Sequence, residues 1–588
     1  MTAKKGKPPV GYSDFKNLRE QELYYVDKTL LIKKIWENSS QVLLFPRPRR
    51  FGKTLNLSML RYFFEKIDDS TTSDNSKVND DSKVSLSGLS DDSSTSLSRL
   101  FEGLFISKQP EIITHQGQYP LIYLTFKDVK EMTWENCLYQ LRLLLASEFS
   151  RHKAYFLNVF LELEESEILN ALHDPLTPSA PLAMALSCLM KILNRATGQK
   201  IIVLIDEYDT PIHAGHQYGY YEEVILFMRN LLSGAFKDNS YLEKGVMTGV
   251  LRISKESIFT GLNNISVSSI TCPEFSSYFG FTETEVEKIL RDFSVEHPQE
   301  VKDWYNGYIF GRQVIYNPWS IINFLNSEDR DLKPYWIDSS SNDLVRDLIL
   351  NGPISLRESV ATLLRGESIS SVLPENIVLR DIAATEENIW SLLTFSGYLK
   401  ALNPRMEGTR IVYDLSIPNM EVLRFYEDTI QSWLRQQIGD HRLQQLLKSL
   451  LQEDIASFEQ YLQDMVATVL SYHDTSGDEP ERVYHAFVLG LFVNLGSQYE
   501  IRSNRESGYG RYDVMLIPKN PQQTGFVFEF KKVDGKYDKT AKTAIKSALR
   551  QIQERKYALE LRQTGVQRIL GIGVVVHKKK VWVEAVEL

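Results

Sequence analysis

Apolar residues form short runs in the first half of the chain, and helical segments lie between the runs. The runs are rich in β-branched residues and have the length of buried strands, at 41–45, 120–127, 200–205 and 245–253. The segment 54–67, which follows the first run, carries apolar residues at helical spacing. Strands that alternate with helices predict a parallel α/β sheet.

The rest of the chain shows two further patterns. From about 275 to 475 the apolar residues recur mostly at helical spacing, and we interpret 390–419 as a winged-helix hairpin that binds DNA or forms a lid. From about 480 the pattern is mixed α/β, with helices expected at 478–494 and 540–560 and strands at 498–503, 511–517, 525–531 and 569–576.

The segment 68–99 is rich in Ser and Asp and nearly free of aromatic residues. Such a composition buries too little apolar surface to order a chain, so we predict a disordered surface insertion. We expect three domains, at 10–274 with this insertion inside it, at 275–475 and at 476–588. A length of 588 residues agrees, because it is too long for one hydrophobic core.

Composition and charge narrow the class of protein. The chain is 43% hydrophobic and 24% charged, as is typical of globular proteins, and its net charge of −9 means that any contact with nucleic acid must be local. We find no signal-peptide or membrane-spanning pattern, and the three cysteines are widely spaced, as in a reducing compartment. We therefore expect a cytoplasmic protein without membrane contact, or a nuclear one in a eukaryotic host.

The loop 47–54 reads RPRRFGKT and stands between a predicted strand and a predicted helix. In a P-loop the backbone and the helix N-terminus hold phosphates, the lysine reaches the terminal phosphates and the threonine binds Mg²⁺. Lys53 and Thr54 fit these roles, with Gly52 and Arg50 as further nucleotide contacts. Arg47 occupies the position of the usual first glycine, which leaves a basic surface turn as the alternative.

A second motif favours the nucleotide site. The buried run IIVLI ends in Asp206 and Glu207, which places one carboxylate near a Mg²⁺-bound water and the next beside an attacking water. A strand whose polar end faces solvent is the alternative. Both motifs occur in chain order within the alternating region, so we predict ATP binding with Mg²⁺. Arg252, after the run at 245–251, is a candidate sensor or arginine finger, or an ordinary surface arginine.

The run TGFVFEFKK near the C-terminus indicates a second kind of site, with different chemistry. Glu529 and Lys531 are two residues apart and share one face of a strand, and a hairpin would bring Asp513 alongside. Paired carboxylates suit Mg²⁺ or Mn²⁺, and a neighbouring lysine can orient water or stabilise charge on a phosphate. Glu481 would add a third carboxylate from the preceding helix, and Gln551 would line the site from the following one. The alternative is a cross-strand ion pair.

The local charge agrees with a phosphate-bearing partner. Residues 500–588 contain 18 Lys and Arg against 10 Asp and Glu, so this region is basic within an acidic chain. A basic surface of this kind is typical of nucleic-acid binding, although it could also serve solubility.

The motifs PRPRRFGKT, LIDEYD, TGVLRISKESIFTGLNN, WYNGY, YHAFVLGL, SNRESGYGRYD and FEFKK occur in this order. The order resembles bacterial-type AAA-ATPase-like proteins with a C-terminal PD-(D/E)XK nuclease-superfamily domain, from about residue 10 to 580 apart from the insertion. Tyr512 stands where the name of the superfamily has proline. The resemblance implies a P-loop ATPase core, a helical or winged-helix middle and a restriction-endonuclease-like C-terminal domain. Its motifs place the phosphate loop at Lys53 and Thr54 and the acidic strand end at Asp206 and Glu207. They place the nuclease motif at Asp513, Glu529 and Lys531, with Glu481 on the preceding helix.

Two functions of different classes remain open from the sequence. The first is an ATP-binding and ATP-hydrolysing protein coupled to metal-dependent phosphodiester cleavage of nucleic acid, with DNA favoured. The second is a nucleotide-dependent switch that binds nucleic acid or a protein through an inactive nuclease-like domain. Homo-oligomer formation fits either function.

Overall fold

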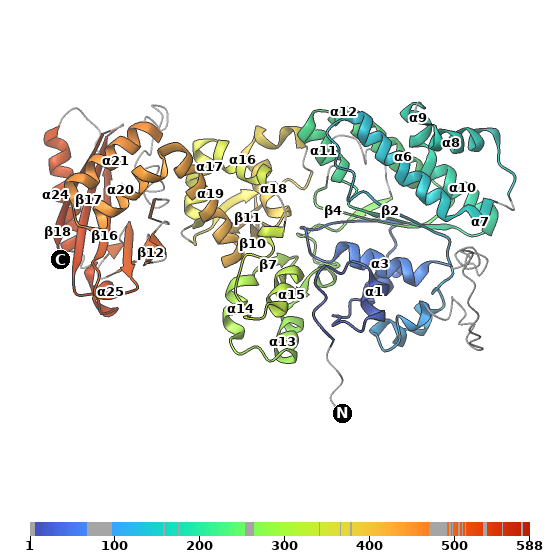
Figure 1. Ribbon diagram of the computed structural model, residues 1–588, viewed down its shortest axis with the longest axis horizontal. Coiled ribbons are helices and arrows are strands. Elements are labelled where there is room, and N and C mark those ends of the chain that lie inside the picture. The colour runs from blue at the N-terminus through green and yellow to red at the C-terminus, as the bar shows by residue number, and fades with distance from the viewer. Residues whose placement is uncertain are drawn as a thin grey trace, which may run out of the picture. The chain divides into compact units, whose positions relative to one another are not determined.

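The structure is a computed structural model (Figure 1). It describes residues 6–66, 97–156, 159–174, 177–252, 264–339, 342–364, 366–376, 379–469, 491–492, 495–496, 498–503, 506–507, 510–511, 513–532, 538–554, 557–577 and 580–588. The predicted insertion at 68–99, apart from its last three residues, and Glu481 with most of its predicted helix lie outside the described residues.

Contacts divide the chain into two compact units. The first unit comprises Met1–Ser339 and Ser371–Tyr413, and the second comprises Ser340–Ser370 and Asp414–Leu588. The three domain boundaries expected from the sequence stay a prediction. No helix among the described residues is long and apolar enough to span a membrane.

The first unit is built on a five-stranded sheet in the order β2-β3-β4-β1-β5, and every pairing in it is parallel. The strands are β1 (Val42–Pro46), β2 (Leu121–Thr125), β3 (Ile201–Asp206), β4 (Leu242–Gly249) and β5 (Ile265–Val267). All residues of β1 and β3 are buried, as expected for strands covered on both faces. The predicted parallel α/β sheet is confirmed.

Helices cover both faces of this sheet. Figure 1 shows α1 (Phe15–Glu20) and α3 (Lys53–Phe64) on one face, with α6 (Trp134–Arg151), α10 (Ala185–Thr197) and α12 (Tyr221–Phe236) on the other. Further helices of this part are α2 (Leu30–Glu37), α5 (Pro110–Ile113), α7 (Lys153–Phe156), α8 (Leu163–His173), α9 (Ser179–Ala183) and α11 (Thr210–Tyr218).

The first unit continues with a smaller α+β part. Its antiparallel sheet has the order β6-β8-β7, from β6 (Phe281–Thr282), β7 (Tyr308–Phe310) and β8 (Gln313–Tyr316). The helices α13 (Glu283–Asp292), α14 (Pro298–Tyr305) and α15 (Pro318–Asn326) share a hydrophobic core with it. These strands were not expected from the helical pattern, because each has only two to four residues.

The segment interpreted as a winged-helix hairpin contains the expected elements. Helix α18 (Glu386–Phe395) is followed by β10 (Lys400–Glu407) and β11 (Arg410–Ser416), which form a sheet with β9 (Ile369–Val372) in the order β10-β11-β9. The helix and the strand pair do not by themselves define a winged-helix domain, so that assignment stays a prediction.

The second unit contains a mixed five-stranded sheet in the order β12-β15-β16-β17-β18. Only the β16–β17 pairing is parallel. The strands are β12 (Tyr499–Ser503), β15 (Val514–Pro518), β16 (Gly525–Lys532), β17 (Ile569–His577) and β18 (Lys580–Glu587), with a short hairpin of β13 (Glu506–Ser507) and β14 (Gly510–Arg511) beside them. The four strands expected from the sequence are present, whereas β18 was not expected.

Helices pack on both faces of this sheet as well. One face packs against α20 (Asp440–Leu451) and α21 (Ile455–Val469) through residues such as Phe528. The other face packs against α24 (Asp538–Glu554) and α25 (Ala558–Gln563) through residues such as Val527. The unit also contains α16 (Asp343–Asn351), α17 (Ile354–Leu364) and α19 (Met420–Ile438). Alternate residues of β16 therefore face different helix layers.

Candidate functional sites

The phosphate-type loop lies between β1 and α3, at the carboxyl edge of the parallel sheet. Gly52 has φ 81°, a left-handed conformation that favours glycine, and a Cβ placed on it would meet no atom within 4 Å. Helix α3 begins at Lys53, so the amides of its first turn are available beside this open space. The geometry is that of an anion cradle at a helix N-terminus.

Hydrogen bonds join the loop to the acidic strand end. The Thr54 hydroxyl donates to Asp206 Oδ2 at 2.7 Å, and the Thr248 hydroxyl donates to Asp206 Oδ1 at 2.5 Å. Asp206 is the last residue of β3 and is fully buried. Thr248 lies on β4, which is the strand between β1 and β3. The structure thus brings together the two predicted motifs and adds Thr248, which the sequence did not single out.

Lys53 is held inside its own loop. Its Nζ donates to the carbonyl oxygens of Arg47 at 2.9 Å and Pro48 at 3.0 Å. Burial lowers the pKa of the Lys53 ammonium, although the carboxylates of Glu207 and Asp206 act in the opposite direction. Glu207 has φ 51° and its Oε2 accepts a hydrogen bond from the Thr210 hydroxyl at 3.2 Å. A phosphate entering the cradle would give the lysine a stronger partner than the two carbonyls.

Arg47 has a structural role that explains why it replaces glycine. Its side chain is fully buried, and Nη1 donates to the carbonyls of Pro46 and Ser268. Its guanidinium carbon lies 5.1 Å from the ring centroid of Phe279 and 5.3 Å from that of Phe310. Burial lowers the pKa of Arg47 to about 9. The side chain therefore points into the core and leaves the cradle to the backbone.

The same loop is tied to the α+β part that follows the sheet. The Trp336 indole N–H donates to the Arg49 carbonyl at 3.0 Å, and the Phe51 carbonyl accepts from the Gly280 amide at 3.0 Å. Arg50, expected as a nucleotide contact, has its guanidinium carbon 4.1 Å from the Trp319 ring centroid. A movement of the phosphate loop therefore changes its contacts with Trp336, Gly280 and Trp319.

Arg252 lies beyond the end of β4 and contacts a different acid from those of β3. Its Nη1 is 3.7 Å from Glu375 Oε2. The loop that carries it is fixed to the acidic strand end, because Asp209 Oδ2 accepts hydrogen bonds from the amides of Val250 at 2.8 Å and Leu251 at 2.9 Å. Asp209 was not singled out from the sequence, although it follows Asp206 and Glu207 in the same motif.

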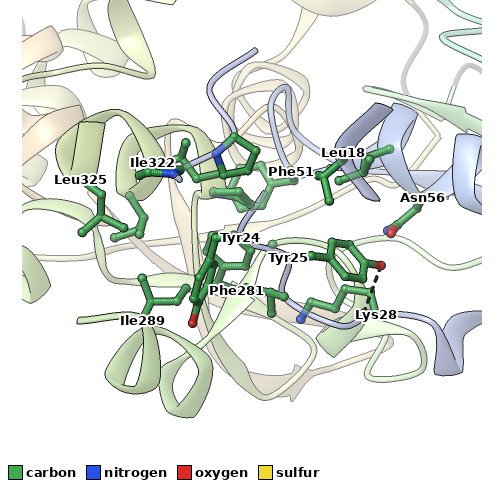
Figure 2. Close-up of a pocket in the computed structure, with 18 of the residues that line it drawn as sticks. Leu18, Tyr24, Tyr25, Lys28, Phe51, Asn56, Phe281, Ile289, Ile322 and Leu325 are labelled. Atoms are coloured by element: carbon green, nitrogen blue, oxygen red, sulfur yellow. Dashed lines mark hydrogen bonds between the residues drawn. The ribbon is translucent and has the colours of Figure 1, made fainter. Parts of the chain in front are cut away.

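A mainly apolar cavity of about 650 Å³, including the part open to solvent, adjoins the phosphate loop. Figure 2 shows Tyr24, Tyr25, Phe51 and Phe281 around it. Gly52, Leu55 and Asn56 line it from the loop and from the first turn of α3. Its apolar lining suits the flat ring of a small ligand.

The second site lies on the face of β16 that packs against α24. Strands β15 and β16 are antiparallel and Val514 is paired with Phe528. The residue before Val514, Asp513, therefore lies opposite the residue after Phe528, Glu529. Asp513 Oδ2 accepts a hydrogen bond from the Phe530 amide at 2.7 Å. Lys531 Nζ donates to Glu529 Oε1 at 3.0 Å. The structure therefore brings Asp513, Glu529 and Lys531 together, as expected from the sequence.

Helix α24 completes this site. The Gln551 side-chain amide donates to Glu529 Oε1, as the expected position of Gln551 suggested. Glu529 is paired with Gly573 on β17, and a Cβ on Gly573 would lie 3.3 Å from Ala548 Cβ and 3.4 Å from the Ile545 carbonyl. Glycine at this position lets α24 approach the sheet closely. The Glu529 side chain is 3% exposed and that of Lys531 is 30% exposed, so the lysine forms the open side of the site.

The donor sets of both sites fit a divalent cation. Thr54 and Asp206 offer a hydroxyl and a carboxylate in contact beside an anion cradle, and Asp513 and Glu529 offer two carboxylates across a strand pair. Mg²⁺ is commonly held by one or two carboxylates together with water and phosphate oxygens. Among the described residues there is no group of three or more His, Cys, Asp or Glu side chains arranged for a metal, and Glu481 is outside that part of the chain.

Comparison with known families agrees with this geometry. The AAA-ATPase-like family model, which describes predicted AAA-ATPases, matches residues 9–78 and 87–259. A model for the PD-(D/E)XK nuclease superfamily matches residues 479–586. The chain therefore carries an AAA-ATPase-like domain and a PD-(D/E)XK nuclease-superfamily domain, and the resemblance stated from the motifs is confirmed.

One relative is similar over nearly its whole length. It is an uncharacterized protein in the vnfD 5′ region of Azotobacter chroococcum mcd 1, 25% identical over 595 residues, with 96% of each chain covered.

Proposed function

We propose that the protein binds and hydrolyses ATP and that its nucleotide state controls metal-dependent cleavage of phosphodiester bonds in nucleic acid, with DNA as the substrate. The observation that carries the ATPase half is the hydrogen bond between Thr54 and Asp206, which joins the two nucleotide motifs. The nuclease half is supported by the assembly of Asp513, Glu529, Lys531 and Gln551 on one face of a sheet.

At the ATPase site the protein positions the phosphates. The amides at the start of α3 bind the phosphate oxygens, and Lys53 exchanges its two loop carbonyls for the terminal phosphate. Glu207 orients the attacking water. Mg²⁺ held by Thr54 and Asp206 would neutralise part of the negative charge on the phosphates. The base of the nucleotide enters the cavity beside Gly52 and Leu55.

At the nuclease site the residues prepare a phosphodiester for attack by water. Asp513 and Glu529 would hold the cation, which would polarise the phosphate and activate the water. Gln551 fixes the Glu529 carboxylate, and Lys531 stabilises the negative charge that develops on the phosphate.

ATP turnover tests the first half. In Glu207→Gln we expect ATP to bind normally while the hydrolysis rate falls by about 10²-fold or more, because the water loses its base. Lys66→Ala changes an exposed residue just after α3 and should hydrolyse ATP like the native protein. Normal hydrolysis in Glu207→Gln would contradict the assignment of this residue.

A nucleotide-dependent switch with an inactive nuclease-like domain is the second candidate. It is favoured by the two hydrogen bonds that Lys531 and Gln551 already make to Glu529 Oε1. Calorimetric titration with Mn²⁺ separates the two candidates. An active site should bind Mn²⁺ in the native protein and in Glu554→Gln, which changes an exposed residue of α24, and should lose that binding in Glu529→Gln. If the native protein and Glu529→Gln give the same titration, the switch is the better account.

A further inference from the structure

Glu375 joins two loops at the carboxyl edge of the parallel sheet. It follows β9 in the segment Ser371–Tyr413, which belongs to the first unit. Its Oε1 accepts hydrogen bonds from the hydroxyls of Ser269 at 3.0 Å and Thr271 at 2.5 Å, and both residues follow β5. Its Oε2 lies 3.7 Å from Nη1 of Arg252, which follows β4. One carboxylate therefore ties the loop after β4 to the loop after β5.

The phosphate loop emerges between these two loops. In the sheet, β1 lies between β4 and β5 and runs parallel to both, so the three strands end at the same edge. The loop that carries Arg252 is also bonded to the acidic strand end, because Asp209 accepts hydrogen bonds from the amides of Val250 and Leu251. Arg252 and its partner Glu375 thus belong to the edge of the sheet that carries the nucleotide motifs.

The two oxygens of the Glu375 carboxylate are engaged differently. Two hydroxyl hydrogen bonds fix Oε1, whereas Arg252 Nη1 is too far from Oε2 for a hydrogen bond and is attracted by charge alone. Among the described residues Arg252 Nε is buried without a partner, and the Arg252 side chain is 31% exposed. A guanidinium held so loosely can exchange a carboxylate for a phosphate, which offers it stronger, bidentate hydrogen bonds.

We propose that Glu375 holds Arg252 while the nucleotide site is empty or contains ADP, and that the terminal phosphate of ATP takes Arg252 from Glu375. Glu375 is then a positioning residue, and the exchange is the step that reports ATP. This inference rests on the proposed ATP binding. Ser371–Tyr413 connects Ser340–Ser370 to Asp414–Leu588 along the chain, so ATP removes one anchor of the segment that joins the two stretches of the second unit.

Nucleotide titration tests the exchange. Calorimetry in Mg²⁺ measures the Kd for ADP and for AMP-PNP, an ATP analogue that resists hydrolysis. Glu375→Gln keeps an oxygen acceptor for Ser269 and Thr271 but removes the charge that attracts Arg252. We expect the Kd for AMP-PNP to fall about threefold, the scale of a partly exposed ion pair, while the Kd for ADP changes by less than about twofold.

A double variant separates this exchange from a general effect of charge. Arg252→Gln should raise the Kd for AMP-PNP about tenfold or more, because the terminal phosphate loses charge-assisted hydrogen bonds. Adding Glu375→Gln to Arg252→Gln should then change neither Kd, because no arginine is left to release. If the carboxylate acted only by repelling phosphates, its removal would tighten nucleotide binding with or without Arg252.

A matched control is the exposed ion pair of Arg380 and Glu222 in the same unit, in which Nη1 lies 2.9 Å from Oε1. Glu222→Gln removes the acid from a shorter arginine contact and should leave the Kd for both nucleotides at the native values. Circular dichroism and thermal melting establish that all variants are folded.

Three results would overturn defined parts of this proposal. An equal Kd for AMP-PNP in the native protein and Glu375→Gln would exclude Glu375 as the competitor for Arg252 and leave ATP binding standing. A gain in affinity that persists in the double variant would exclude the exchange itself. Native protein that binds neither nucleotide would contradict the proposed ATPase function.

Discussion

Arg47 allows a test in which the usual sequence pattern and this structure predict opposite results. Replacing Arg47 by glycine restores the common first residue of the phosphate loop, yet it removes a charged donor from the carbonyls of Pro46 and Ser268. Each such bond contributes about 1.5–3 kcal/mol, and each cation–π contact with Phe279 and Phe310 about 1 kcal/mol. The variant no longer buries a charged side chain, and this gain offsets several kcal/mol of the stabilisation lost with these contacts.

We expect Arg47→Gly to lower the free energy of unfolding by about 3 kcal/mol, which corresponds to a Tm lower by roughly 6 °C. The buried Arg47 side chain fixes the backbone whose carbonyl holds Lys53, so loosening of this backbone should raise the Kd for ATP about tenfold. Scanning calorimetry and nucleotide titration measure the two effects. Arg49→Gly makes the same chemical change at an exposed side chain and should change stability by less than about 1 kcal/mol. An unchanged Tm with tighter ATP binding in Arg47→Gly would refute the structural role of Arg47.

Three further results are expected. Burial raises the pKa of Glu148, but His152, whose Nε2 lies 3.4 Å from Oε1, and the hydrogen bonds from Arg151 outweigh it and lower the pKa to about 2. The carboxylate therefore stabilises the fold above pH 4.5. Acid titration from pH 4.5 to 2 should lower the free energy of unfolding of the native protein by about 3 kcal/mol, and Glu148→Gln should not show this loss. Gly573→Val should displace α24 and lower DNA cleavage at least tenfold while ATP hydrolysis is unchanged. Because the Trp336 indole is bonded to the phosphate loop, ATP should change the tryptophan emission, and Trp336→Phe should lose most of that change.

Local patterns were sufficient to locate the motifs and most strands. Buried β strands appear in the sequence as continuous apolar runs, so the approximate positions of β1, β3 and β16 could be predicted. The pairing of Asp513 with Glu529 followed from the two-residue period of a strand and one short hairpin.

Long-range relations could not be predicted in the same way. The position of β4 between β1 and β3 places Thr248 on Asp206, and nothing near Thr248 in the sequence indicates that neighbour. In the sequence, Arg47 is one of three arginines in a short loop and resembles a surface residue. Its burial could not be predicted, because it depends on aromatic residues more than 230 positions away. Strand β18 was missed since Glu584 and Glu587 interrupt its apolar pattern.

In the proposed function, two sites on one chain work together. The most direct test is the rate of plasmid cleavage in Mg²⁺ or Mn²⁺, with and without ATP, for the native protein, Lys53→Ala and Glu529→Ala. We expect ATP-dependent cleavage by the native protein, loss of the ATP response in Lys53→Ala and loss of all cleavage in Glu529→Ala. Cleavage by Glu529→Ala at the native rate, or no cleavage by a native protein that still hydrolyses ATP, would contradict the account.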